Sequence, residues 1–176
     1  VMTGFASLLA SGSLAAFTLA NNIQSVALGI FGVAFSVAVF PALSIAIAER
    51  QEKVFFTLLA DTTRRILFFV LPLSALMIVF RAQFVRVILG SGQFNWEDTI
   101  VTFNVLALLS VSLSAQSLIP LFARGFFALQ NTKPPLLIAF WSEVFHVVLL
   151  VILRQSFSFS IEMLASAFSF VTIVNF

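Results

Sequence analysis

A long uncharged run is the feature that most limits how this chain can fold. Residues Val1–Ala48 contain no Asp, Glu, Lys, Arg or His. A water-soluble domain has about a quarter of its residues charged, whereas this chain is 9% charged and 61% hydrophobic. We therefore expect an all-α, polytopic transmembrane helix bundle, because helices satisfy their own backbone hydrogen bonds in lipid.

Short polar joints divide the chain into apolar segments, and crossing the hydrocarbon takes about 20 helical residues. The first complete segment is longer than that, so the helix must tilt, bend or emerge into water. Pro41 offers a place to bend, because it removes one backbone hydrogen bond. The charged segment that follows has apolar residues at helical spacing, which predicts a short interfacial helix over residues 49–65. The predicted spans cover residues 14–47, 66–89, 99–129 and 136–153, with partial spans at 1–10 and 159–176.

We interpret the chain as a fragment of one transmembrane transporter domain, with five to six spans in all. Its orientation follows from the basic residues, which are commoner in cytoplasmic joints. Successive joints lie on alternate sides of the membrane, so they divide the Lys and Arg residues into a larger and a smaller group on opposite sides. The cytoplasmic group is Arg50, Lys53, Arg64, Arg65, Arg124 and Lys133, and the outer group is Arg81, Arg86 and Arg154.

Polar residues inside the first complete span carry part of the functional signal. Asn21, Asn22, Gln24 and Ser25 cover more than one face of a helix, so they cannot all face lipid. Two interpretations stay open, namely hydrogen bonding between helices and the lining of a substrate path. Small residues recur at every fourth position further along, which predicts close helix packing at Ala34, Ala38 and Ala42.

Glu143 and His146 form the second candidate site. They lie three residues apart near the middle of the predicted span 136–153, so they share a helix face. Ionisable groups at this depth are costly, which favours a functional role. The hypothesis is an ion- or proton-coupling site, and the alternative is a hydrogen-bonded pair that joins two helices.

The sequence contains no pattern typical of an enzyme. It has no Cys and one His, and it lacks a phosphate-binding glycine loop. Glu143 and His146 have too few neighbouring ligands in the sequence to predict a metal site. We therefore expect no catalytic residue, no metal and no cofactor. The net charge of +2 is too small to indicate nucleic acid, and membrane lipids are the expected partners.

Three stretches, in order, resemble the lipid II flippase family (MurJ/MviN) of bacteria. The first is ANNIQSVALGIFGVA at residues 20–34, followed by FPALS at 40–44. The second is VRVILGSGQF from Val85, with Asp98 after it, and the third is ARGFFALQNTKPP at 123–135. The resemblance covers essentially the whole chain.

This resemblance implies the second lobe of a two-lobed inner-membrane transporter of about fourteen helices. Family members move the undecaprenyl-linked peptidoglycan precursor, lipid II, to the outer leaflet by alternating access around a cationic cavity. Membrane potential or a coupling ion takes part in that movement. A lipid-linked anionic precursor is thus the implied partner. The implied path residues here are Asn21, Asn22, Gln24, Ser25 and Arg124, with Glu143 and His146 for coupling.

The sequence departs from the family pattern at three positions. Asn22 stands where family members commonly have an Arg that faces the substrate's diphosphate, and Asn131 replaces a usual Asp. His146 stands where an Asn is frequent. Because Asn22 supplies hydrogen bonds without positive charge, three alternatives stay open. They are a related lipid-linked oligosaccharide exporter, a cation-coupled drug antiporter, and a non-transporting scaffold of cell-wall synthesis.

Overall fold

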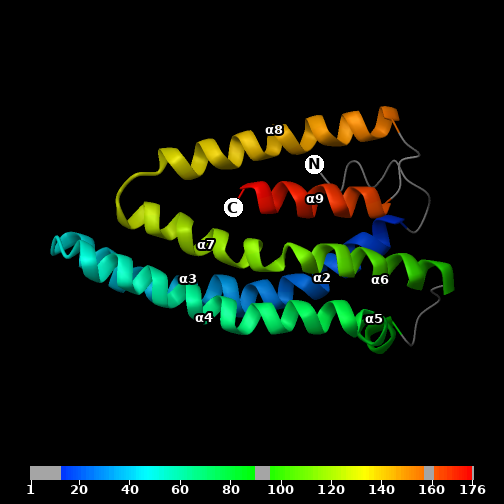
Figure 1. Cartoon of the computed structure of the whole chain (residues 1–176), viewed down its shortest axis with the longest axis horizontal. Helices are drawn as coiled ribbons and strands as arrows, with labels where there is room; N and C mark the ends of the chain where they lie inside the picture. Colours follow the sequence, from blue (N-terminus) through cyan, green and yellow to red (C-terminus); the bar gives the residue numbers. More distant parts are fainter. Residues whose placement is uncertain (1–12, 90–95, 157–160, 176) are drawn as a thin grey trace.

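The fold is a bundle of long, nearly parallel helices. The computed structural model describes residues 13–89, 96–156 and 161–175, and in these residues it contains helices and no strand (Figure 1). The elements in chain order are α2 (Ser13–Ala27), η1 (Leu28–Val33), α3 (Ala34–Ala48), α4 (Glu52–Val79), α5 (Arg81–Leu89), α6 (Trp96–Val111), α7 (Leu113–Ala128), α8 (Lys133–Ser156) and α9 (Ile161–Asn175). The predicted all-α class is confirmed.

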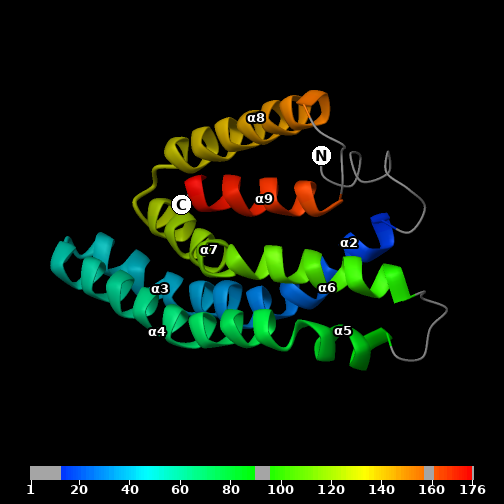
Figure 2. The ribbon, with the colours of Figure 1, turned by 45° about the vertical axis from the view of Figure 1, so that its right-hand side comes forward.

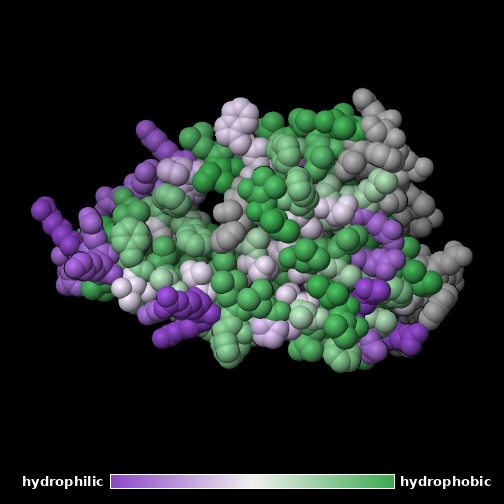
Figure 3. Space-filling model, viewed as in Figure 1, coloured by the Kyte–Doolittle hydropathy of each residue, from purple (hydrophilic) through white to green (hydrophobic). Residues whose placement is uncertain are grey.

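Three of the described helices are long and apolar enough to cross a bilayer, and a bent pair forms a further candidate. The three are Phe17–Ala48, Glu52–Val79 and Lys133–Ile152, and the pair is Thr99–Val111 with Leu113–Ala128. Apolar side chains cover most of the visible middle of the bundle (Figure 3). Hydrophilic residues gather at the end that holds the turn between α3 and α4 (Figures 1 and 3). The chain is therefore an integral membrane protein.

The same backbone turn ends α3 and α7. Arg50 and Gln130 both have positive φ, at 57° and 56°. The residue that follows each of them donates its N–H to the carbonyl oxygen of the third residue from the helix end. Gln51 donates to Ala46 at 2.8 Å, and Asn131 donates to Phe126 at 3.0 Å. These bonds satisfy carbonyls that the helix end leaves free. Both turns lie at the same end of the bundle (Figure 1).

The irregular part of the first span lies at η1 and not at Pro41. Residues Leu28–Val33 form one π-helical segment, and the chain continues through Pro41 as a regular part of α3. Gly32 explains the position of this π-helical segment, because its backbone packs directly on Ser117 of α7. A Cβ added to Gly32 would lie 2.9 Å from both the Cα and the carbonyl oxygen of Ser117. Close packing thus accounts for the π segment, and the bend at Pro41 stays a prediction.

Two further predicted boundaries differ from the structure. No separate interfacial helix covers residues 49–65, since α4 runs without a break from Glu52 to Val79. Residues 52–71 contain neither Gly nor Pro, and a single buried stripe continues along them through Phe55, Thr62, Ile66 and Val70. The predicted span 66–89 breaks instead at Phe80, and the predicted span 99–129 breaks at Ser112 with a bend of 46°.

Three hydrophobic cores follow one another along the bundle. The first joins side chains of α2, α5, α6, α8 and α9. The second joins α4 and α7 with Ala27 at the end of α2. The third joins α3, α4 and α7 around Leu43 and Phe55. In the second view α9 lies between α8 and the α6–α7 pair, as it does in the first (Figures 1 and 2). The helix breaks fall between the first core and the other two.

The two glycines of η1 provide a matched test of this packing. Gly32→Ala is expected to destabilise the protein by about 1–3 kcal/mol, because the Ser117 backbone cannot move aside for the new methyl group. Gly29→Ala is expected to stay within about 0.5 kcal/mol, because a Cβ there meets no atom within 4 Å. Thermal unfolding of the detergent-solubilised full-length protein measures both. Equal unfolding temperatures for the two variants would contradict the close contact between η1 and α7.

Candidate substrate path and coupling site

One face of the α2–η1–α3 helix is exposed along its whole length. It begins with Asn21, Asn22 and Ser25, all of which are exposed. It continues past Gly29 to the predicted packing residues Ala34, Ala38 and Ala42, which are exposed as well. These alanines therefore do not pack against the described helices, contrary to the expectation. The face is polar at one end, and at the other end small side chains alternate with the exposed apolar side chains of Val33, Val37 and Ile45.

Gln24 points away from this face and into the bundle. Its side chain is 1% exposed, and its Nε2 donates a hydrogen bond to the carbonyl oxygen of Leu109 on α6, at 2.9 Å. Its Oε1 is buried and has no partner among the described residues. Positions 22 and 24 are about 200° apart around a helix, so neighbouring amides have opposite surroundings. Gln24 therefore makes the interhelical contact that the sequence left as one of two interpretations.

Arg124 lies on α7, four residues before the helix ends at Ala128. Its side chain is half-buried, and it forms no ion pair with the described residues. Among the described residues, Arg124 forms no hydrogen bond or ion pair with Asn21, Asn22 or Ser25. The α7–α8 turn that follows it lies at the same end of the bundle as the turn between α3 and α4 (Figure 1).

Glu143 and His146 lie on α8 and meet as the spacing predicts. The distance from His146 Nδ1 to Glu143 Oε2 is 3.9 Å. The two side chains have different surroundings, since His146 is 3% exposed and Glu143 is 55% exposed. The ring of Phe168 on α9 covers His146, with the ring centres 5.9 Å apart. His146 Nε2 is buried without a partner among the described residues.

A cavity of about 400 Å³ between α7, α8 and α9 contains this pair. Its lining is mostly apolar, and Gln116, Ser142 and Thr172 add polar groups to it. Within the described part of the chain, no cluster of three His, Asp or Glu side chains could hold a metal ion. The site can offer one carboxylate, one imidazole and several neutral oxygens to a small cation or a proton. A coupling role for Glu143 and His146 stays a prediction.

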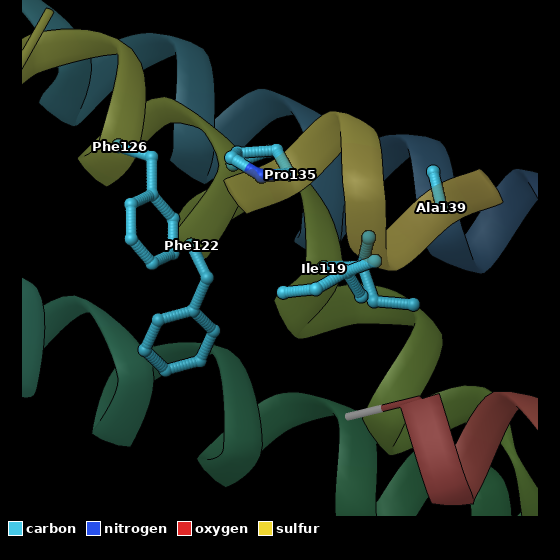
Figure 4. Close-up of a pocket in the computed structure, with 7 residues that line it drawn as sticks. Ile119, Phe122, Phe126, Pro135 and Ala139 are labelled. Atoms are coloured by element: carbon cyan, nitrogen blue, oxygen red, sulfur yellow. The ribbon is translucent and has the colours of Figure 1, made fainter. Parts of the chain in front are cut away.

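A second cavity, of about 370 Å³, lies next to this one. Phe122 and Phe126 of α7 line it together with Pro135 of α8 (Figure 4). Ile119 and Ala139 line both cavities, so the two spaces adjoin. Helix α8 thus stands apart from α7 over much of its length and packs mainly on α9 (Figures 1 and 2).

Sequence reasoning missed a polar cluster where α6 meets α7. Ser112 and Ser169 are both buried, and Gln116 is half-buried beside them. Gln116 Nε2 donates to Ser112 Oγ at 2.8 Å, and Ser169 Oγ on α9 donates to the carbonyl oxygen of Leu108 at 2.6 Å. The sequence does contain a sign of this cluster, because these hydroxyl and amide groups interrupt otherwise apolar spans. Their small size and lack of charge made them inconspicuous.

The family model described as lipid II flippase MurJ matches residues 1–176, the whole chain. The chain belongs to the lipid II flippase MurJ family. Curated relatives named "Probable lipid II flippase MurJ" include those of Rhizobium meliloti, at 30% identity over 85% of this chain, and Buchnera aphidicola, at 26% over 100%. The aligned regions make up 28% and 34% of these two relatives. The chain therefore spans about a third of their length.

A solved structure has the same fold. The lipid II flippase MurJ in an inward closed conformation matches 97% of this chain with a TM-score of 0.84 and 24% identity. The match covers 35% of that protein. The helices of this chain thus reproduce one contiguous part of a MurJ family fold. The suspected family and the expectation of a fragment are both confirmed.

The contrast between Asn22 and Gln24 can be measured. Gln24→Ala is expected to lower stability by roughly 1–3 kcal/mol, because it empties a buried position and removes the bond to Leu109. Asn22→Ala is expected to leave stability within about 0.5 kcal/mol, because its side chain is exposed. Thermal unfolding of the full-length protein measures both variants. A destabilised Asn22 variant with a stable Gln24 variant would contradict this assignment.

Proposed function

We propose that the full-length protein is a lipid II flippase of the bacterial inner membrane. It moves the undecaprenyl-linked peptidoglycan precursor from the cytoplasmic to the outer leaflet by alternating access. The observation that carries this proposal is the family match over the whole chain. The exposed polar end of the α2–η1–α3 face supports it, because exposed amides in a membrane span are favourable only beside a polar surface or a wet cavity.

On this proposal the α2–η1–α3 face forms part of the cavity wall. Asn21, Asn22 and Ser25 offer hydrogen bonds to the sugar and diphosphate oxygens of the headgroup. Gly29 leaves the backbone accessible within the same exposed face. Arg124 is the cationic candidate of this fragment.

We further propose that Glu143 and His146 form the coupling site. The cavity between α7, α8 and α9 gives a small cation or a proton access to both side chains. A charge gained or lost there changes the electrostatic energy of a region in which α8 has few contacts with α7. The coupling site therefore lies beside a part of the bundle that has space to rearrange.

Genetic replacement tests the main proposal. A host depleted of its own lipid II flippase is expected to resume wall synthesis when the full-length gene is supplied. Asn22→Ala is expected to reduce this rescue, and Phe68→Ala, on an exposed position of α4, serves as the matched control with unchanged rescue. Failure of the stably expressed wild-type protein to rescue would contradict the proposal.

The same strains separate the alternatives. A cation-coupled drug antiporter would give proton-dependent efflux that Glu143→Gln abolishes, with no effect on lipid transport. A scaffold of cell-wall synthesis would tolerate changes at Asn21, Asn22 and Ser25 and lose function on changes in its outer loops. A related lipid-linked oligosaccharide exporter would restore export of another polymer and leave lipid II in the inner leaflet.

A further inference from the structure

The cavity that contains Glu143 and His146, here called the coupling cavity, is joined to helix α2 by hydrogen bonds. We propose that Gln116 and Ser112 are positioning residues that transmit cation or proton uptake in this cavity to α2. Three hydrogen bonds lead from the cavity wall to Gln24 of α2. The inference rests on the proposed function, because it states how uptake at the coupling site changes the binding of lipid II on the exposed face of α2.

Gln116 of α7 is the first link, because it belongs both to the cavity wall and to the polar cluster at the helix break. It lines the coupling cavity, and its Nε2 donates to Ser112 Oγ at 2.8 Å. Its amide oxygen has no hydrogen-bond partner among the described residues. A cation, or an N–H group of His146, attracts such an oxygen. Because the amide group is planar and rigid, a pull on its oxygen weakens the bond from its nitrogen to Ser112.

Ser112 is the second link, at the break between α6 and α7. Its Oγ accepts the bond from Gln116 and donates to the carbonyl oxygen of Leu109 at 2.9 Å. Ser169 Oγ of α9, at 3.2 Å, is a second acceptor for the same hydroxyl hydrogen. A hydroxyl group that accepts a hydrogen bond becomes a stronger donor. Loss of the bond from Gln116 therefore weakens the bond from Ser112 to Leu109.

Helix α2 is held through the same carbonyl oxygen. Gln24 Nε2 donates to the Leu109 oxygen at 2.9 Å, and Ser112 N–H bonds it as well, at 3.2 Å. A carbonyl oxygen has two lone pairs, and here three donors share it, so a weaker bond from Ser112 Oγ strengthens the bond from Gln24. Helix α2 packs mainly on α6 and has Asn21 and Asn22 on its exposed side. The strength of the Gln24 bond thus affects how this side is held.

Helix α9 gives the cavity a second contact with this network. The ring of Phe168 covers His146, with the ring centres 5.9 Å apart, and the next residue, Ser169, contacts Ser112 Oγ. Uptake in the cavity therefore reaches Ser112 from α7 and from α9. The other described side chains that line the cavity are uncharged, so Glu143 and His146 are the titratable groups that face it there.

The affinity for lipid II under different cation and proton concentrations tests the connection. The full-length protein is placed in nanodiscs of phosphatidylethanolamine and phosphatidylglycerol. The Kd of lipid II is measured in sodium chloride and in choline chloride, and at about pH 6 and about pH 8, on the two sides of neutrality where His titrates. The wild-type Kd is expected to change about fivefold or more in at least one comparison, which is the low end of the coupling between two sites.

Gln116→Leu and Ser112→Ala are expected to reduce this change to less than about twofold, because each removes a hydrogen bond worth roughly a fivefold difference. Ser110→Ala is the matched control with the wild-type change. Ser110 is a buried serine of α6 whose Oγ donates only to the Leu106 oxygen of its own helix, at 2.7 Å. The ratio of the two Kd values is the reading, so a variant that is merely less stable does not give the same result. If Ser112→Ala does not fold, the half-buried Gln116 still decides.

The outcomes for the connection and for the function are separate. A wild-type change that persists in Gln116→Leu and Ser112→Ala would overturn the connection and leave the flippase proposal in place. Leu28, which also lines the cavity, would then be the direct contact between the cavity and η1. Equal loss in Ser110→Ala, or a wild-type Kd that responds to neither cations nor pH, would overturn the connection as well. A wild-type protein that binds no lipid II would contradict the proposed function and the connection together.

Discussion

The hydrocarbon of a membrane offers no water to a backbone carbonyl, and this constraint determines how the bundle is built. A regular helix satisfies each carbonyl internally, so each irregularity needs a donor from elsewhere. The structure supplies it at Ser112, where Ser169 and Gln24 reach the carbonyl oxygens of Leu108 and Leu109 from α9 and α2. Polar side chains of α2 and α9 therefore join these two helices to α6 at the Ser112 break.

Close backbone packing between η1 and α7 also occurs near the break at Ser112. Gly32 of η1 lies directly against Ser117 of α7, five residues beyond the break at Ser112. The π segment and the bend thus occur in neighbouring helices near the same level of the bundle. Serine and glycine at this level allow the helices to approach, and the hydroxyl groups provide the hydrogen bonds. Polar contacts occur away from this level too, as where Asn104 Nδ2 of α6 donates to Glu162 Oε1 of α9 at 2.9 Å.

The sequence predicted the helical class and the membrane environment, because both depend on summed hydrophobicity. The helix breaks could not be predicted in the same way. Pro41, Pro72 and Pro120 all lie inside helices, whereas Phe80 and Ser112 interrupt them without any proline. Tertiary contacts decide these positions, and a contact such as Ser169 with Leu108 joins residues 61 positions apart. For the same reason the sequence could group Asn22 with Gln24 but could not tell which one faces the interior.

If the proposed function is right, the exposed face of α2, η1 and α3 meets the headgroup of a lipid-linked precursor during transport. Site-specific photo-cross-linking measures this directly. A photoreactive amino acid at Asn22 of the full-length protein, in membranes that contain radiolabelled lipid II, is expected to capture the label. The same group at Phe68, which is 73% exposed on α4, is expected to capture none of the headgroup label. Equal labelling at both positions, or labelling at Phe68 alone, would contradict the account.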